Sequence, residues 1–95
     1  MRRQYVVSYD ISDDKRRNEV FKTLCGYGDH AQFSVFFCEL SETELVRLRG
    51  SLRSAINEHE DQVMVIDLGR AAHPMEVGLE VLGKPYKPRI RTLVV

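Results

Sequence analysis

Hydrophobic and polar residues alternate through residues 4–10, which read QYVVSYD. The odd-numbered positions carry Tyr and Val, whereas the even-numbered positions end on the carboxylate of Asp10. Because successive side chains of a strand point to opposite faces, this alternation predicts a half-buried strand. The Ser-Asp-Asp segment at 12–14 supplies capping residues, and apolar positions 20, 21, 24 and 25 predict a helix to about Tyr27, followed by glycine stop signals.

A second apolar run, AQFSVFFCEL, occupies residues 31–40 and predicts another extended segment. Ser41 and Glu44 then have the spacing of a capping box, in which Ser caps the helix and Glu reaches back. Apolar residues at 45, 48, 52 and 56 share one helical face, so we expect the helix to end near Asn57. A third strand is predicted over Gln62–Leu68.

The remaining residues are less regular in pattern. We expect a short helix around residues 75–82, and an extended segment at 84–88, where two prolines exclude a helix. A last strand is predicted over about residues 87–95. The order of elements predicts an α+β fold, a ferredoxin-like βαββαβ sandwich with right-handed crossovers and both helices on one face. That fold needs residues 31–40 to split into two strands, although no Gly, Pro, Asn or Asp marks a turn there.

Length and composition fit one small domain spanning residues 1–95. The chain has 95 residues, of which 43% are hydrophobic and 29% are charged. A core this small favours a homodimer, because dimerisation buries further apolar surface. No run is long enough to span a membrane and no signal peptide is visible, so we expect no membrane partner. Cys25 and Cys38 are interpreted as reduced, buried thiols of a cytoplasmic protein.

The net charge is zero, but it is unevenly distributed. Residues 1–22 carry a net charge of +2, residues 23–69 carry −5 and residues 70–95 carry +3. If the two basic ends meet in space, they form a positive surface that permits nucleic-acid binding. Solvated charges without a partner are the equally weighted alternative.

Asp10 is the first candidate for chemistry, because it ends a strand where loops build binding sites. Its structural alternative is to cap or orient the turn that follows. Its functional role would be to hold Mg²⁺, which prefers carboxylate oxygens and often takes only one or two of them from the protein. One carboxylate per chain is few for a metal site, and a two-fold dimer would supply the second.

A basic cluster follows in the first turn of the predicted helix, where Lys15, Arg16 and Arg17 are consecutive. Cations are unfavourable at a helix N-terminus, but a bound phosphate would reverse that penalty. Arg16 and Arg17 are therefore candidate nucleic-acid ligands. The alternative is a solvated cluster that Asp13 and Asp14 balance.

Four aromatic residues lie on the predicted strands, namely Tyr9, Phe33, Phe36 and Phe37. Alternation places Phe33 and Phe37 on one face and Phe36 on the other. The core is the favoured position for most of these rings, whereas an exposed ring would be able to stack on an unpaired base.

Two motifs together resemble a known family. The segments VVSYDISDDKRR (6–17) and HAQFSVFFCEL (30–40), followed by a capped helix, resemble the small CRISPR-associated endonucleases of the spacer-adaptation module. This is the Cas-two family, which has VapD-like endoribonuclease relatives. The resemblance covers residues 4–68. One departure is His30, where the family often has Arg, and another is Phe37, where many members have Glu.

The resemblance implies a ferredoxin-like homodimer whose tail strand crosses to the partner. It implies that Asp10 is the metal-binding catalytic residue of a Mg²⁺-dependent nuclease acting on single-stranded RNA or double-stranded DNA. It also implies that Tyr9, Arg17, Ser34 and Phe36 line the nucleic-acid cleft, and that the CRISPR integrase is a partner. The alternatives are a non-catalytic scaffold of the integration complex and an interaction module without a nucleic-acid role, which the paired motifs disfavour.

Overall fold

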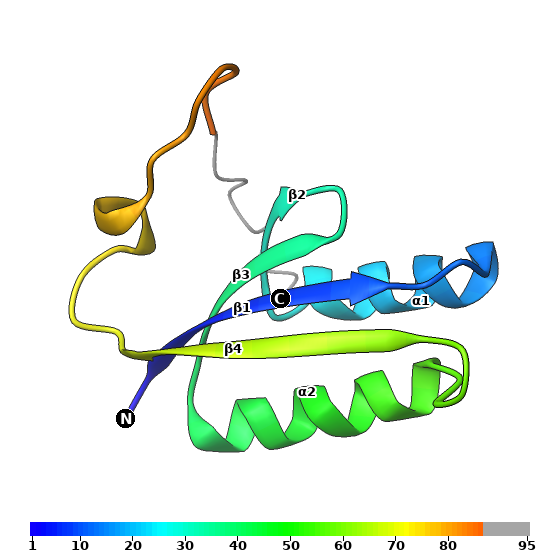
Figure 1. Cartoon of the computed structure of the whole chain (residues 1–95). Helices are drawn as coiled ribbons and strands as arrows, with labels where there is room; N and C mark the ends of the chain where they lie inside the picture. The colour runs from blue at the N-terminus through cyan, green and yellow to red at the C-terminus, as the bar shows by residue number, and fades with distance from the viewer. Residues whose placement is uncertain (87–95) are drawn as a thin grey trace.

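A computed structural model describes residues 1–86 of the chain, and Figure 1 shows the arrangement of its elements. The predicted last strand at 87–95 lies outside the described residues. The elements, in chain order, are β1 (Arg3–Asp10), α1 (Asp14–Cys25), β2 (Gly28–Gln32), β3 (Val35–Leu40), α2 (Glu42–Ala55), β4 (Gln62–Arg70) and a 3₁₀ turn, η1 (Met75–Gly78).

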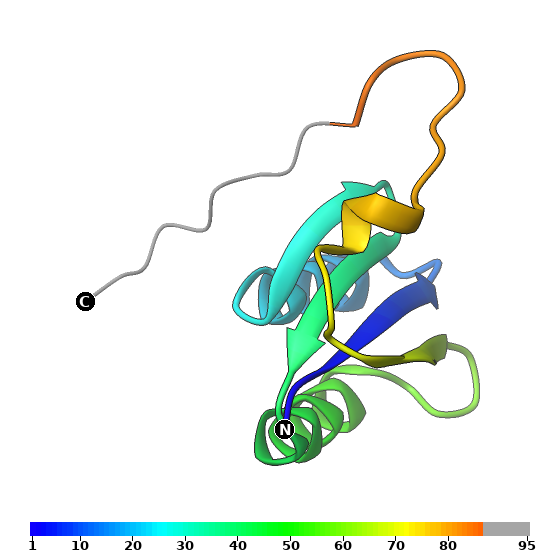
Figure 2. The ribbon, with the colours of Figure 1, turned by 90° about the vertical axis from the view of Figure 1, so that its left-hand side faces the viewer.

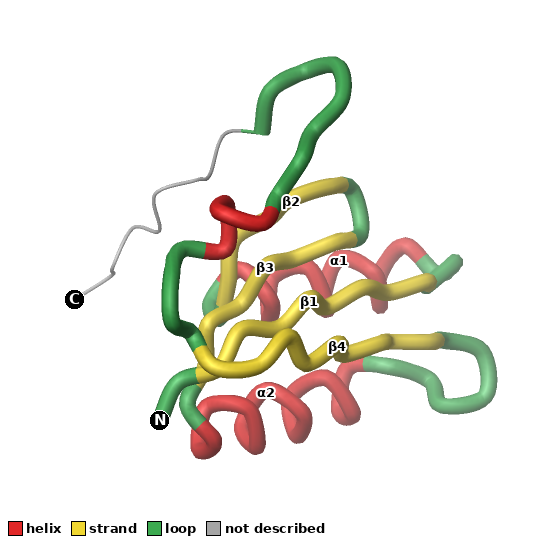
Figure 3. Tube along the Cα trace, turned by 60° about the vertical axis from the view of Figure 1, so that its left-hand side comes forward, coloured by secondary structure: helices red, strands yellow, loops and turns green. Residues whose placement is uncertain are grey.

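The four strands form one sheet in the order β2-β3-β1-β4, in which every neighbouring pair is antiparallel. Both helices cover the same face of this sheet, as Figure 3 shows, and the other face is left open. This is the ferredoxin-like arrangement that the order of elements predicted, so the fold class is confirmed. The handedness of the two crossovers stays a prediction.

The core lies between the sheet and the two helices. Alternation along β1 is as predicted, because Tyr5, Val7 and Tyr9 are buried and Asp10 is exposed. The other buried hydrophobic residues are Ile11, Val20, Leu24, Phe36, Cys38, Leu40, Leu45, Leu48 and Leu52. The predicted apolar faces of both helices supply five of these residues, which is why the helices pack where they do.

The predicted split of residues 31–40 is real, and contacts from a distant strand hold the turn. The turn lies at Phe33 and Ser34, between β2 and β3. The backbone N–H of Tyr9 donates to the Ser34 carbonyl at 3.1 Å, and the Tyr9 hydroxyl donates to the Phe33 carbonyl at 3.3 Å. Tyr9 therefore stabilises a turn whose own residues carry no turn signal.

Two expectations about the end of α1 were wrong. The helix ends at Cys25, with Gly26 as its cap, and not at Tyr27. The next strand begins at Gly28, which faces Cys38 of β3 at close range. Cys25 is exposed, because the helix ends before that position can turn toward the sheet, whereas Cys38 is buried as expected.

The capping box of α2 is formed in both directions. Glu44 N–H donates to Ser41 Oγ at 3.2 Å, and Ser41 N–H donates to Glu44 Oε1 at 2.8 Å. The hydrogen bond from the Ser41 backbone is the main reason that the pKa of Glu44 is lowered. Arg2, near the start of the chain, also contacts this cap. Its Nη1 donates to Glu44 Oε1 at 2.7 Å and its Nε donates to Glu39 Oε2 at 3.0 Å.

The chain beyond β4 lies partly over the open side of the sheet. The strand runs to Arg70, two residues past the predicted end, and its bulge opposite Gln4 is accommodated by Gly69 at a φ of 95°. The predicted helix at 75–82 is only the short turn η1. The buried Gln4 side chain donates to the His73 carbonyl at 2.6 Å and fixes the start of this segment. The chain then arches beyond β2 (Figure 2) and returns, so that the Tyr86 ring lies 5.6 Å from the Phe37 ring of β3.

Within residues 1–86, no helix is both long and apolar enough to cross a membrane.

Candidate nucleic-acid and metal site

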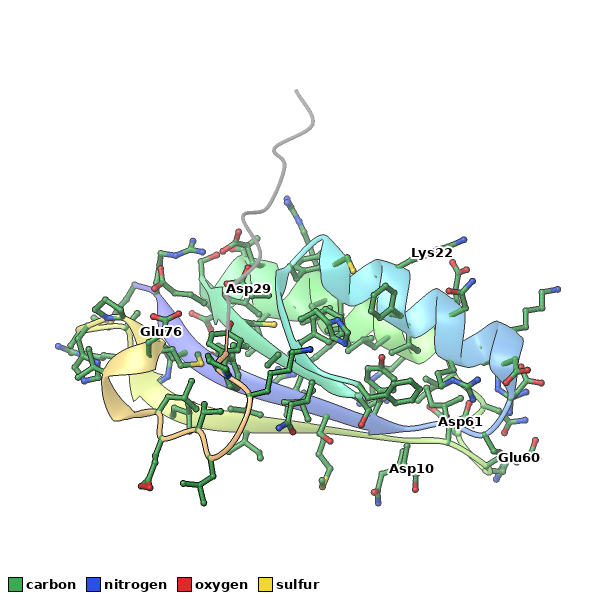
Figure 4. All side chains as sticks on the ribbon, turned by 90° about the horizontal axis from the view of Figure 1, so that it is seen from above. Asp10, Lys22, Asp29, Glu60, Asp61 and Glu76 are labelled. Atoms are coloured by element: carbon green, nitrogen blue, oxygen red, sulfur yellow. The ribbon has the colours of Figure 1, made fainter. Side chains whose placement is uncertain are left out.

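Asp10 is the last residue of β1 and lies opposite Gln62 of β4. Its side chain is exposed and projects from the face of the sheet that the helices leave open, as Figure 4 shows. The carboxylate makes no hydrogen bond or ion pair with any of residues 1–86, and the cap of α1 is Asp13 instead. The alternative in which Asp10 caps the turn is therefore not what the structure shows.

Apolar side chains lie along the face that carries Asp10. Ser8 and Val6 precede it on the same face of β1, and their partners across β4 are Met64 and Ile66. Met64 is 49% exposed and Ile66 is 47% exposed. Asp10, whose carboxylate has no partner among residues 1–86, thus lies at one end of an exposed hydrophobic stripe, and exposed apolar patches mark interaction surfaces.

The donor set for a metal within one chain is small. Among the residues that the structure describes, no three His, Cys, Asp or Glu side chains come together as metal ligands. Asp10 alone fits Mg²⁺ only where other oxygens complete the shell, from a second chain, a phosphate or water. The residues present are thus compatible with a shared Mg²⁺ site and do not form a closed one.

Arg16 is bound to the loop before β4. Its Nε donates to Asp61 Oδ2 at 2.7 Å and its Nη2 donates to Asp61 Oδ1 at 3.2 Å, in a bidentate pair. The Asp61 side chain is fully buried and also accepts from the Asn57 N–H at 2.8 Å. These hydrogen bonds, from Arg16 first, hold the pKa of Asp61 below its ordinary value. The geometry gives Arg16 a structural contact that the sequence pattern did not indicate.

Arg17 holds the loop between β1 and α1. Its Nη1 donates to the carbonyls of Ile11 at 3.1 Å and Ser12 at 3.2 Å, and its Nη2 pairs with Asp14. Nε–H and one Nη2–H have no partner among residues 1–86, so two of the five donors of the guanidinium remain available to a ligand. Asp14 therefore balances the charge of Arg17, which is part of the balancing of the basic cluster that the sequence predicted.

Tyr9 and Ser34 lie together at the β2–β3 turn and not on the face that carries Asp10. Tyr9 is buried, and burial is the main cause that raises the pKa of its hydroxyl. Ser34 is half-buried, and its carbonyl accepts the hydrogen bond from the Tyr9 backbone. Both residues border the turn that presents Phe33, so their first role is to position it.

Phe36 does not have the exposure that a nucleic-acid contact needs. Its side chain is 0% exposed, and its ring packs 5.6 Å from that of Phe21 and 4.9 Å from that of His30. No face of the ring is accessible to a base, which corrects the expectation from the resemblance. The exposed ring is that of Phe33, which is 81% exposed. Phe33 was one of four aromatic candidates, and the sequence did not distinguish it from the others because the turn that exposes it carries no local signal.

Comparison with known proteins identifies the family of this chain. A family model for CRISPR associated protein Cas2 matches residues 3–74. This chain belongs to the Cas2 family. It is 40% identical over 91 residues to a CRISPR-associated endoribonuclease Cas2 of Rhodospirillum rubrum, covering 96% of this chain and 88% of that protein. It is 34% identical over 95 residues to the corresponding Cas2 of Geobacter sulfurreducens, covering 100% of this chain and 99% of that protein.

Solved structures give the same result for the fold. The crystal structure of Streptococcus pyogenes Cas2 matches with a TM-score of 0.73 at 29% identity, over 84% of this chain and 99% of that one. A hypothetical protein from Thermus thermophilus matches with a TM-score of 0.78 at 35% identity, over 94% of this chain and 100% of that one. The Cas2 family match includes Asp10, the basic cluster and the β2–β3 turn.

Proposed function

We propose that this Cas2 protein is a Mg²⁺-dependent endonuclease that hydrolyses phosphodiester bonds, in single-stranded RNA, in double-stranded DNA or in both, as a homodimer. The observation that carries the proposal is the carboxylate of Asp10, which ends the inner strand β1 on the open face of the sheet and has no partner among residues 1–86. The names of the Rhodospirillum rubrum and Geobacter sulfurreducens relatives, which are endoribonucleases, support the reaction class.

The dimer is proposed from the same face. The exposed stripe on β4 and the half-buried side chains of β1 face away from the helices, so a second copy would cover them. Such packing would bring the two Asp10 carboxylates toward one axis. The proposed crossing of the tail strand at 87–95 to the partner belongs to this arrangement.

The role of Asp10 in the reaction is to bind and orient. When bound, Mg²⁺ supplies a Lewis acid that polarises a phosphoryl oxygen and lowers the pKa of a coordinated water. The two carboxylates of the dimer would hold it by their oxygens, and Arg17 Nε–H would donate to a phosphate oxygen of the substrate. Arg16 is left out of this role, because Asp61 takes its Nε and Nη2 in a bidentate pair and the carboxylates of Asp13 and Glu60 also lie near its charge.

The experiment compares RNA cleavage by the wild type, Asp10→Asn and Glu42→Gln, with Mg²⁺ and with EDTA. Glu42 is an exposed carboxylate in the first turn of α2, so its change removes one negative charge away from the site. We expect cleavage that needs Mg²⁺, survives Glu42→Gln and is lost in Asp10→Asn. Equal cleavage by all three proteins would indicate a contaminating nuclease and would count against the proposal.

A non-catalytic scaffold is the second candidate function. It is favoured by one observation, the lack of any cluster of three metal-ligating side chains among residues 1–86. In this case the dimer binds nucleic acid and the CRISPR integrase in the cytoplasm without turnover. Spacer acquisition that is unchanged by Asp10→Asn would support the scaffold over the enzyme.

A further inference from the structure

We infer that the cleft beside the β2–β3 turn is a subsite for one unpaired base of a single-stranded nucleic acid, which stacks on Phe33. This inference rests on the proposed function, because it assigns a place to part of that function's substrate. The cleft has a volume of about 450 Å³, at the small end of the range for ligand sites. Its lining residues are Tyr9, Asp14, Arg17, Asn18, Phe21, His30 and Phe33.

The wall of the cleft is aromatic and fixed in place. The rings of Phe21 and His30 meet edge to face with centroids 4.9 Å apart, and His30 lies 4.9 Å from the buried ring of Phe36. Because Phe36 is part of the core, the imidazole of His30 is backed by the most rigid part of the domain. A flat ligand would therefore meet a preformed surface, and ordering that surface on binding would cost little conformational entropy.

Phe33 presents a ring to solvent from a backbone that is anchored. Its carbonyl accepts from the Tyr9 hydroxyl and lies 3.3 Å from His30 Nε2, and the next carbonyl accepts from the Tyr9 N–H. The side chain is nevertheless 81% exposed, so it contributes little to the core. An aromatic ring that projects into solvent from an anchored backbone offers its face to an unpaired base, as stacking platforms do.

The polar groups at the cleft fit a nucleotide. The Asn18 side chain makes no hydrogen bond within residues 1–86, and its amide offers both a donor and an acceptor to the edge of a base. Arg17 Nε–H is a donor for a phosphate oxygen. A base with its phosphate would use both the aromatic wall and these polar groups, and the Asp14 carboxylate that also lines the cleft is paired with Arg17.

The position of the cleft makes the subsite selective for single strands. Tyr9 lines the cleft and Asp10 is the next residue on β1, so both lie at the same end of the strand on opposite faces. The bases of a duplex are paired and stacked inward, and they do not reach a pocket of this kind without being extruded. A single strand offers its bases directly, so the cleft adds affinity only for unpaired nucleic acid.

The first test measures binding of a fluorescently labelled single-stranded RNA of about 12 nucleotides and of its blunt duplex. Phe33→Leu removes the ring and keeps an apolar side chain. We expect single-strand affinity to fall about 5- to 150-fold, since base–aromatic stacking is worth about 1–3 kcal/mol per base, and duplex affinity to stay within about twofold. A variant that binds the single strand as tightly as the wild type would overturn the inference.

A second measurement does not depend on a loss of binding. The chain contains no tryptophan, so Phe33→Trp introduces a single indole at the proposed stacking position. We expect its fluorescence to be quenched on titration with the single strand and changed much less by the duplex. Val46→Trp is the matched control, because Val46 is also exposed (59%) but lies on α2, outside the cleft. Equal quenching at both positions, or none at Phe33→Trp, would refute stacking.

Failure of the subsite is distinguishable from failure of the proposed function. If Asp10→Asn abolishes Mg²⁺-dependent cleavage while Phe33→Leu leaves single-strand binding intact, the function stands and the subsite is wrong. If Phe33→Leu weakens single-strand binding while no cleavage depends on Asp10, the subsite stands on a scaffold. A wild type that binds no single strand refutes the subsite directly.

Discussion

Among the glycines of residues 1–86, Gly28 at the start of β2 has the least room for a Cβ atom. A Cβ atom built there would lie 2.4 Å from Cys38 Sγ and 2.5 Å from the Phe37 carbonyl oxygen. Carbon contacts are favourable only near 3.5–4.0 Å, so relief of the clash requires a shift of about 1 Å. The Phe37 oxygen belongs to the backbone of β3, so no side-chain rotation removes this overlap.

The magnitude follows from that geometry. Forcing an extra methyl group into a packed site costs about 1–3 kcal/mol, and the shift here must be made by paired strands. Gly50→Ala is the matched control, because Gly50 lies inside α2 and a Cβ there meets nothing within 4 Å. That substitution should stabilise the protein by about 0.5–1 kcal/mol, since Gly is a poorer helix former than Ala.

The assay is thermal unfolding of both variants and the wild type at one protein concentration, because association makes the Tm concentration-dependent. At about 4–8 °C per kcal/mol, Gly28→Ala should lower the Tm by roughly 5–20 °C and Gly50→Ala should raise it by roughly 2–8 °C. If Gly28→Ala were as stable as Gly50→Ala, the pairing of Gly28 with Cys38 would not be as described, and the reasoning from close approach would fail.

Three further predictions follow from the site. Phe36→Ala should lower the free energy of unfolding by about 3–5 kcal/mol, whereas Phe33→Ala should change it by less than about 0.5 kcal/mol, as urea denaturation will show; comparable effects would contradict their assignment to core and surface. The pKa of Asp61 is lowered in the folded state, so the ionised carboxylate stabilises the protein above about pH 4. The difference in free energy of unfolding between the wild type and Asp61→Asn should therefore shrink as the pH falls below that value. A constant difference from about pH 6 to about pH 2 would refute the role of the Arg16 pair. Ile66→Asp should shift the protein to monomer in sedimentation velocity while Val46→Asp does not, because only Ile66 lies on the open face; an unchanged dimer in both would place the interface elsewhere.

Local signals in the sequence predicted α1, α2, β1 and β4, with ends close to those observed. The capping box at Ser41 and Glu44 and the alternation that ends at Asp10 are physical patterns of short range, and both are present as predicted. The split between β2 and β3 had to be inferred from the fold, since its turn is held by Tyr9, some 24 residues earlier in the chain. Contacts of that range leave no trace in a local pattern.

The candidate site was predictable in part for the same reason. Asp10 is exposed because of strand alternation, which the sequence shows. Arg16 and Arg17 were identified as a basic cluster, but the hydrogen bonds of Arg16 to Asp61 depend on a loop 45 residues away, and those of Arg17 to the Ile11 carbonyl depend on the fold of the loop before α1. The role of Phe36 in binding was implied by the resemblance and not by the alternation, which left open which of the four aromatic rings is exposed; the turn exposes Phe33.

The contacts of Arg2 have a practical consequence for anyone who prepares this protein. Arg2 precedes the first strand, yet it pairs with the same Glu44 oxygen that receives the Ser41 N–H and completes the start of α2. Removal of an amino-terminal tag by a protease that also trims Met1 and Arg2 would take away these hydrogen bonds from a helix that begins about forty residues later in the chain.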